Sequence, residues 1–181
     1  MKDIKVLFIG NSHTYVNDLP KLFKEYAKND NCNASVFMIA HAGWKLKQHA
    51  AEPDVKFNIL NGNFDYVVLQ EHAHPFGPKE EVMEAMKKIN EFIKEANSKL
   101  VIFPTWSKKN ERNVQGFMSD VHREIGKELN GIVANVDYEW WKAMDNNPSV
   151  DLYGSDGAHA SIYGSRLAAK EIWESIKGDL K

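Results

Sequence analysis

The sequence predicts an α/β protein in which helices cover both faces of a five-stranded parallel sheet, a three-layer α/β/α sandwich. Short β-branched runs alternate with amphipathic helical stretches, and the runs are apolar throughout, as expected of strands buried on both faces. Parallel strands need long right-handed crossovers, which place helices on both sides of the sheet. No repeat, low-complexity tract or linker divides the chain, so residues 1–181 are expected to form a single domain.

Each element is recognised by its own pattern. The runs predicted as strands are Lys5–Ile9, Ala34–Ile39, Tyr66–Leu69, Leu100–Phe103 and Ile132–Val136. Helices are predicted where apolar residues recur at helical spacing: Leu19, Leu22, Phe23, Tyr26; Val82, Met86, Ile89, Ile93; Val114, Phe117, Met118, Val121, Ile125, Leu129; and, from about Ser161 to Ile176, Ile162, Leu167, Ala168, Ile172. The segments 72–78, 104–113 and 145–157, rich in Pro, Gly and Asn, are predicted connections.

Composition excludes several classes of function. Hydrophobic residues make up 43% and charged residues 27%, which argues against disorder. Lys and Arg number 23 against 25 Asp and Glu, and no basic block suggests a nucleic-acid partner. No apolar stretch is long enough to cross a membrane, and no secretory leader precedes the first strand, so a cytoplasmic protein is expected. The single cysteine, Cys32, excludes a disulfide framework.

Chemistry is expected at the carboxyl ends of the strands, where ligands bind in open parallel sheets. Ser12 follows the first strand, Gly43 follows the second and Gln70 follows the third. Asp156 and His159 lie three residues apart in a turn-forming segment before the last helix. A hydroxyl, a flexible backbone amide, a side-chain amide and an Asp/His pair are the components of an acyl-transfer enzyme.

Each component has a chemical reason. A serine hydroxyl is a poor nucleophile unless a base such as His159 accepts its proton, and a carboxylate such as Asp156 can orient that base. The oxygen of the attacked carbonyl becomes negative and needs fixed hydrogen-bond donors. The backbone N–H groups of Ser12 and Gly43 and the Gln70 amide are the candidates, since a glycine backbone can approach a ligand closely.

Two blocks resemble a known family. The segment Phe8-Ile9-Gly10-Asn11-Ser12-His13-Thr14 resembles the first block of the SGNH (GDSL-type) hydrolase superfamily, and Asp156-Gly157-Ala158-His159 resembles its last block. The glycine block of the family is matched by Ala42-Gly43-Trp44, so the resemblance spans residues 4 to about 170. It implies a flavodoxin-like sheet in the order 2-1-3-4-5, a serine esterase or acylhydrolase acting through Ser12, His159 and Asp156, and no cofactor.

The chain departs from the family pattern at two places. Asn11 stands where an acidic residue commonly precedes the serine. The third block, normally Gly-x-Asn-Asp with an Asn lining the oxyanion hole, reads Val68-Leu69-Gln70-Glu71-His72-Ala73-His74 here. Esterase branches that act on carbohydrates resemble this chain in having Gln at the strand end, which assigns the third donor to Gln70, with His74 as the second choice.

Several residues near these blocks are candidates for contact with substrate. They are Asn11, Trp44, Glu71, His74 and Trp106, of which Trp44 and Trp106 follow predicted strand ends. The expected substrate is a small ester. Short acyl groups such as acetyl on a sugar are preferred, mainly because the resemblance implies them and also because no long apolar segment could form a lid. The oligomeric state and the natural substrate do not follow from the sequence.

Two other functions compete with the esterase hypothesis. A metal-dependent hydrolase could use Glu71, His72 and His74, joined by His41 or His159, although no His-Glu-x-x-His motif is present and no metal is expected. A binding domain without catalysis could use Ser12 merely as a helix cap. The motifs of α/β-hydrolases, P-loops and dinucleotide sites do not occur.

Overall fold

The strands of the computed structural model form one sheet in the order β2-β1-β3-β4-β5, and the structure describes residues 2–180. All neighbouring pairs run parallel. The strands are β1 (Lys2–Gly10), β2 (Cys32–Ala40), β3 (Tyr66–Leu69), β4 (Lys99–Ile102) and β5 (Ile132–Val133). The predicted parallel α/β architecture and the strand order implied by the resemblance are therefore confirmed.

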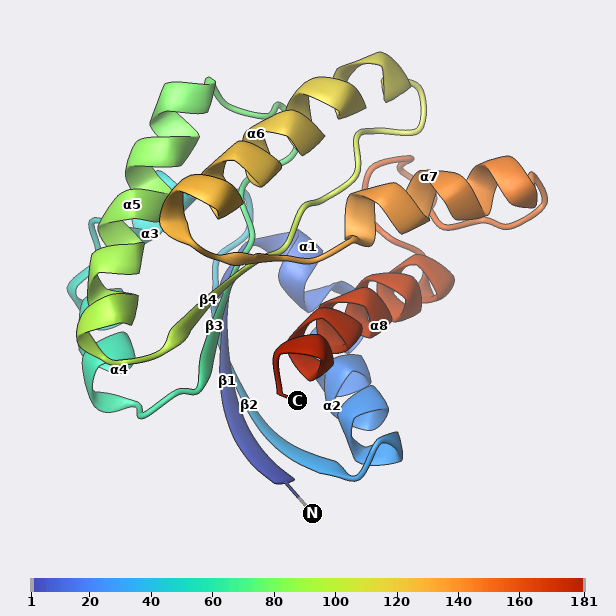
Figure 1. The fold of residues 1–181 in the computed structure, drawn as a ribbon. Helices are drawn as coiled ribbons and strands as arrows, with labels where there is room; N and C mark the ends of the chain where they lie inside the picture. Colours follow the sequence, from blue (N-terminus) through green and yellow to red (C-terminus); the bar gives the residue numbers. More distant parts are fainter. Residues whose placement is uncertain (1, 181) are drawn as a thin grey trace.

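Two groups of helices cover the opposite faces of the sheet (Figure 1). One face carries α3 (Leu46–His49), α4 (Pro53–Asn61), α5 (Lys79–Glu95) and α6 (Gln115–Leu129). The other face carries α2 (Leu19–Asn29), α7 (Val136–Asn146) and α8 (Ile162–Asp179). The short elements are α1 (Ser12–Tyr15) and the 3₁₀ turns η1 (Val16–Asp18) and η2 (Arg112–Val114).

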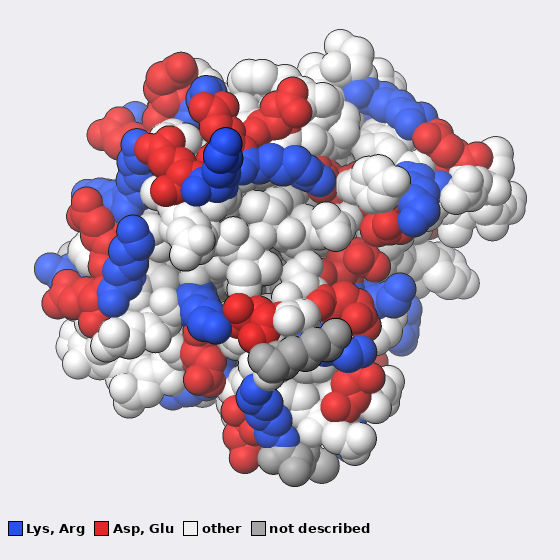
Figure 2. All heavy atoms as spheres, in the orientation of Figure 1, with Lys and Arg blue, Asp and Glu red and all other residues white. Residues whose placement is uncertain are grey.

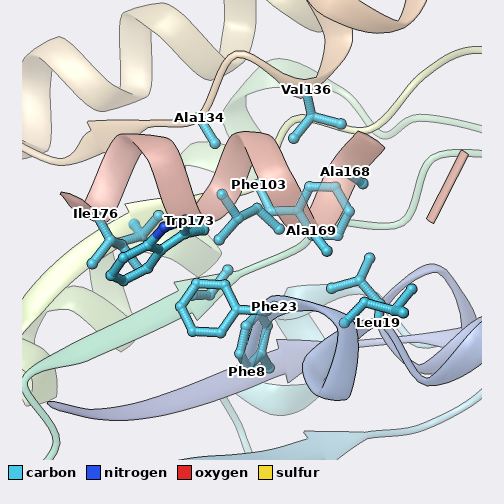
Figure 3. Close-up of a cluster of buried hydrophobic side chains, with 14 of the residues drawn as sticks. Phe8, Leu19, Phe23, Phe103, Ala134, Val136, Ala168, Ala169, Trp173 and Ile176 are labelled. Carbon is cyan, nitrogen blue, oxygen red and sulfur yellow. The ribbon is translucent and has the colours of Figure 1, made fainter. Parts of the chain in front are cut away.

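Alternate residues along each strand pack into two separate hydrophobic cores, one on each face of the sheet. Phe8 of β1 packs toward α2 and α8, whereas Leu7 and Ile9 pack toward α3–α6. In the first core (Figure 3), Phe8 meets Phe23 of α2 edge to face with ring centroids 5.4 Å apart, and Trp173 of α8 lies 5.8 Å from Phe23. Because burying one such side chain contributes roughly 1.5–3 kcal/mol, this cluster holds α2 and α8 firmly against the first strand.

The fifth strand is shorter than the sequence predicted. The pattern indicated a strand over 132–136, but β5 ends at Val133 and α7 begins at Val136. As an edge strand, β5 pairs only with Val101 and Ile102 of β4, so the ladder gives little to keep the chain extended. Val136 is instead fully buried as the first residue of a helix.

Three apolar residues assigned to helix interiors lie on the surface. Val114, Phe117 and Ile162 are 38%, 52% and 43% exposed. Val114 ends η2, and the other two lie in the first turns of α6 and α8, which begin at the carboxyl edge of the sheet. The helical pattern continues there past the strands, so those positions have no core to face.

The surface is polar and its charges are mixed. Figure 2 shows basic and acidic side chains interspersed over one face of the molecule. Some pair across α5 and α6, as Lys79 does with Glu124 at 2.5 Å and Lys87 does with Glu128. None of the helices in residues 2–180 combines the length and the apolar character that crossing a bilayer requires.

Gly164, in the first turn of α8, marks a close approach between backbones. A β-carbon at this position would lie 2.2 Å from the carbonyl oxygen of Leu152 and 2.5 Å from the ring of Trp140. We expect Gly164→Ala to lower the free energy of unfolding by about 1–3 kcal/mol, because backbone or a buried indole must shift. Urea unfolding followed by circular dichroism measures the change.

Gly178→Ala, near the end of the same helix, is the matched control. A β-carbon at Gly178 meets nothing within 4 Å, so helix propensity alone should raise stability by up to about 1 kcal/mol. Equal losses of stability in Gly164→Ala and Gly178→Ala would contradict the packing argument.

Candidate active site

Three side chains from distant parts of the chain form a continuous hydrogen-bonded row. Ser12 Oγ lies 2.8 Å from His159 Nε2, and His159 Nδ1 lies 2.5 Å from Asp156 Oδ2. Ser12 begins α1 at the carboxyl end of β1, whereas the other two residues lie in the turn before α8. The structure thus brings together the hydroxyl, imidazole and carboxylate that the sequence singled out, in the order that acyl transfer requires.

Asn11 holds the loop that carries Ser12. Its Oδ1 accepts the backbone N–H of His13 at 3.1 Å, which caps α1, and its Nδ2 donates to the carbonyl of Trp44 at 3.0 Å. Its backbone N–H donates to Gln70 Oε1 at 2.9 Å. Asn11 is only 1% exposed, so the structure does not support the contact with substrate expected from the sequence. Asn11 ties the loops after β1, β2 and β3 to one another.

The Gln70 amide is engaged inside the protein. Its Oε1 also accepts the hydroxyl of Thr14 at 2.8 Å, and its Nε2 donates to the carbonyl of Glu71 at 2.5 Å. Gln70 is 1% exposed. These contacts give Gln70 a supporting role beneath α1 and do not favour the oxyanion-donor role expected from the sequence.

Gly43 lies exposed on the loop after β2 with a positive φ of +71°. This backbone conformation favours glycine, and a β-carbon there would meet no atom within 4 Å. Among the backbone hydrogen bonds of residues 2–180 outside helices and strands, none is donated by the N–H of Ser12 or of Gly43. Ser12 is the first residue of α1, so its N–H has no acceptor within the helix. Both N–H groups are therefore free to bind a ligand.

Trp44 and Glu71 flank this glycine loop in different ways. Trp44 is half-buried against His41, with ring centroids 4.2 Å apart. Glu71 is 2% exposed and accepts the backbone N–H groups of Leu46 at 3.2 Å and of His72 at 2.7 Å. Burial raises the pKa of Glu71 to about 7. The structure does not support the expected contact of Glu71 with substrate, because its carboxyl group joins the loops after β2 and β3.

Trp106 is a core residue and not a wall of the site. It is fully buried and stacks on Trp140, with centroids 3.7 Å apart and ring planes within 5° of parallel. Its Nε1 donates to the carbonyl of Ala158 at 2.8 Å, in the turn that holds the Asp/His pair. The structure therefore does not support the expected contact of Trp106 with substrate. Trp106 positions the turn, which is also bonded through Gly157, whose carbonyl accepts the N–H of Lys109.

Asp156 is held in its ionised form. It accepts His159 Nδ1–H and also the backbone N–H groups of Ala158 and His159, at 3.0 and 2.9 Å. The hydrogen bond from the His159 ring is the main reason that the pKa of Asp156 lies well below its usual range. A charged carboxylate keeps the hydrogen of His159 on Nδ1, which leaves Nε2 free to accept the Ser12 proton.

Two further histidines gather beside this row. His13, which the sequence analysis did not assign to the site, stacks on His159 with centroids 4.8 Å apart and an interplanar angle of 20°. His74 meets His13 edge to face at 5.0 Å. Burial lowers the pKa of His13 to about 3 and that of His74 to about 4. The position next to Ser12 is visible in the sequence, but the direction of the His13 ring is set only by the fold.

The residues proposed as metal ligands do not converge. The Glu71 carboxylate is engaged by two backbone N–H groups, and His72 Nδ1 lies 3.0 Å from the carbonyl of Pro75. Within residues 2–180, no three or more His, Cys, Asp or Glu side chains are grouped as metal ligands. The geometry gives the metal-dependent alternative no support.

A groove of about 640 Å³ lies between α6 and α7, apart from Ser12. Four of its charged side chains pair with one another: Arg123 with the buried Asp137 at 3.0 Å, and Arg112 with Asp145 at 2.6 Å. Arg112 also covers the ring of Trp141. These pairs stabilise the packing of the two helices.

Solved structures share this architecture over nearly the whole chain. A candidate SGNH hydrolase from Slackia heliotrinireducens superposes with a TM-score of 0.82, covering 97% of this chain and 100% of its own. The chain has the SGNH-hydrolase fold. Two other solved structures are also similar to this chain. A DUF4886 family protein from Bacteroides uniformis superposes with a TM-score of 0.81, covering 98% of this chain and 84% of its own. An acetyl xylan esterase superposes with a TM-score of 0.74, covering 96% of this chain and 100% of its own.

The sequence similarity behind these matches is low. The three proteins are 23%, 15% and 19% identical to this chain, so they establish the SGNH fold alone. No family model and no curated protein matches the sequence. A shared fold does not by itself establish a shared function.

Buried histidines make the stability of the protein depend on acid. Besides His13 and His74, the fully buried His122 of α6 has a pKa lowered to about 4 by burial, and the pKa of His49 is also lowered. In the unfolded chain these histidines take up protons near pH 6.5, whereas in the folded protein they do not. The unfolded state therefore binds more protons as the pH falls from about 6.5 toward 4, and stability falls with it.

His122→Leu is expected to remove one of these contributions. The free energy of unfolding of the variant should fall less steeply between pH 6.5 and 4.5, by up to about 1.4 kcal/mol per pH unit. Urea unfolding at a series of pH values measures both slopes. Because Glu71 and the other groups are common to both proteins, parallel curves would contradict the role of His122.

Proposed function

We propose that the protein is a serine esterase that cleaves short-chain carboxylic esters through an acyl-enzyme on Ser12. The observation that carries the proposal is the row of hydrogen bonds from Ser12 through His159 to Asp156. A hydroxyl bonded to an imidazole, which is bonded in turn to an ionised carboxylate, is an activated nucleophile.

The reaction follows from this geometry. Ser12 Oγ attacks the ester carbonyl carbon while its proton passes to Nε2 of His159, and Asp156 stabilises the imidazolium. The tetrahedral intermediate collapses, the proton passes from His159 to the alcohol oxygen, and the alcohol leaves. Water then attacks the acyl-enzyme, giving its proton to His159, which returns it to Ser12 as the carboxylic acid departs. Water is the only second reactant.

The free N–H groups of Ser12 and Gly43 are proposed to bind the negative oxygen of the intermediate. Each such donor supplies roughly 3–4 kcal/mol of transition-state stabilisation where its removal has been measured. The exposed, positive-φ backbone of Gly43 supports this role.

We assign the third donor to His74, the second choice of the sequence analysis. Its ring lies 5.0 Å from that of His13, which in turn stacks on His159. A pKa of about 4 keeps the His74 ring neutral at pH 7, so one of its nitrogens carries a hydrogen that can be donated. The engaged amide of Gln70 supports the same assignment.

The proposed substrate is a short acyl ester, such as an acetyl group on a carbohydrate. The side chains of His159 and Asp156 are 37% and 48% exposed, so a bulky alcohol portion can reach them. One of the structurally similar proteins is an acetyl xylan esterase, which is consistent with this substrate class. A panel of acetylated sugars against p-nitrophenyl esters of increasing chain length tests the preference.

Ser12→Ala is expected to lower the hydrolysis of p-nitrophenyl acetate by at least about 1000-fold while leaving the circular dichroism spectrum unchanged. The reason is that no hydroxyl remains to attack. A fluorophosphonate should label wild-type protein at Ser12, as located by peptide mass spectrometry, and should not label the variant.

Ser155→Ala, in the exposed part of the same turn as Asp156, is the matched control and should retain wild-type turnover. Wild-type turnover in Ser12→Ala would refute serine catalysis. Activity that is lost with a chelator and restored by zinc would favour the metal-dependent alternative, and a protein with neither turnover nor a fluorophosphonate adduct would be a binding domain.

His74→Ala is expected to lower kcat about 100-fold with little change in KM, because a donor to the transition state is lost. His72→Ala, on the same loop, should have less than about a threefold effect. Gln70→Ala should instead lower the free energy of unfolding by about 1–3 kcal/mol, since the buried groups that it bonds lose their partner. Steady-state kinetics and urea unfolding separate the two roles, and a normal kcat in His74→Ala would exclude His74 as a donor.

A further inference from the structure

We infer that His13 is a positioning residue whose neutral ring forms a platform for His159 and stabilises the imidazolium that His159 becomes. This inference rests on the proposed function, in which His159 takes the proton of Ser12. The observation that carries it is the stack of the two rings, 4.8 Å between centroids with planes 20° apart.

The surroundings fix the His13 ring in this place. The backbone N–H of His13 is held by Asn11, and the ring is wedged edge to face against His74 at 5.0 Å and against Trp106 at 5.4 Å. His13 is 7% exposed. The platform is therefore rigid, and a ring lying on it loses much of its freedom to tilt away from Ser12.

The buried nitrogen of the ring does not explain why an imidazole is found here. His13 Nδ1 is buried and has no hydrogen-bond partner within residues 2–180. An unpaired buried nitrogen costs free energy that an aliphatic side chain of similar size would not. What the imidazole offers over such a side chain is a flat aromatic face, and that face is the part of it that His159 contacts.

An aromatic face attracts a cation placed over it. When His159 accepts the serine proton, its positive ring lies on the face of a neutral neighbour, and the charged form gains stability over the neutral form. The groups around His13 are consistent with a neutral platform. His72 and His74 approach from the loop after β3, and His159 and the anionic Asp156 approach from the turn before α8. Glu111 and Lys108 act on His74, which contacts His13.

The neutrality of His13 is essential to the arrangement. A charge on His13 would repel the imidazolium and oppose proton transfer from Ser12. Burial, helped by repulsion from His74 and His159, keeps the pKa of His13 far below neutrality, at about 3. In the proposed reaction the positive charge therefore forms on His159 and not on His13.

The test compares His13→Phe, which keeps an aromatic face, with His13→Leu, which keeps bulk but has none. The first readout is the titration midpoint of the His159 ring, followed by ¹⁵N-correlated NMR and assigned with His159→Gln. We expect His13→Leu to move this midpoint to lower pH by about 0.5 unit and His13→Phe to leave it within about 0.2 unit of wild type.

The second readout is steady-state hydrolysis of p-nitrophenyl acetate across pH. In His13→Leu, kcat should fall about 10-fold with KM within about twofold, and the acidic limb of the kcat/KM profile should move with the NMR midpoint. His13→Phe should stay within about threefold of wild-type kcat. A residue that served only to fill space would not move the midpoint.

Thermal unfolding of each variant checks that it is folded. If His13→Leu does not fold, His13→Met replaces it as the variant without an aromatic ring. A wild-type midpoint and kcat in the folded non-aromatic variant would overturn the inference, and so would a fall in His13→Phe as large as that in His13→Leu. The NMR titration does not depend on turnover. If Ser12→Ala disproves serine catalysis, the titration therefore still decides whether His13 stabilises the charged ring.

Discussion

The hydrogen bond between Ser12 and His159 joins residues that lie 147 positions apart, and the rest of the site depends on it. Neither residue reaches the other by local geometry. Ser12 is delivered by the buried first strand, and His159 by the turn that leads into α8. The aromatic cluster of Phe8, Phe23 and Trp173 packs α8 onto α2 and β1, so the core sets the distance between the two functional groups.

The residues around the row divide into those that face the solvent and those that hold the loops. Asn11, Gln70 and Glu71 are nearly fully buried, and each connects the loop after one strand to the loop after another. Buried polar groups that are fully paired rigidify the segments that they join, and an unpaired one is costly. In a motif, such residues look the same as residues that contact substrate, because both kinds are polar and lie next to the nucleophile.

This explains how much of the molecule could be predicted from the sequence. The strand pattern, the stripes of α2 and α5 and the Ser/Asp/His set depend on local spacing and on the rule that strand ends converge, and they predicted the sheet and the residues of the row. The roles of Gln70 and Trp106 depend on which way each side chain turns, which the strand pattern does not encode. The early end of β5 follows from its place at the edge of the sheet, and His13 gains its stacking partner only through the packing of the turn before α8.

Trp106 connects the packing beneath the site to the chemistry proposed above it. Its ring lies flat on Trp140 of α7, and its indole nitrogen holds the Ala158 carbonyl, next to the proposed base. A loosening of α7 would therefore be transmitted through two stacked indoles to the imidazole of His159, although no residue of α7 touches the reacting groups in this arrangement. The geometry of the proposed base therefore depends on how well α7 is packed against its own face of the sheet. For the proposed reaction, a change in α7 that leaves the chain folded would lower turnover by displacing the base.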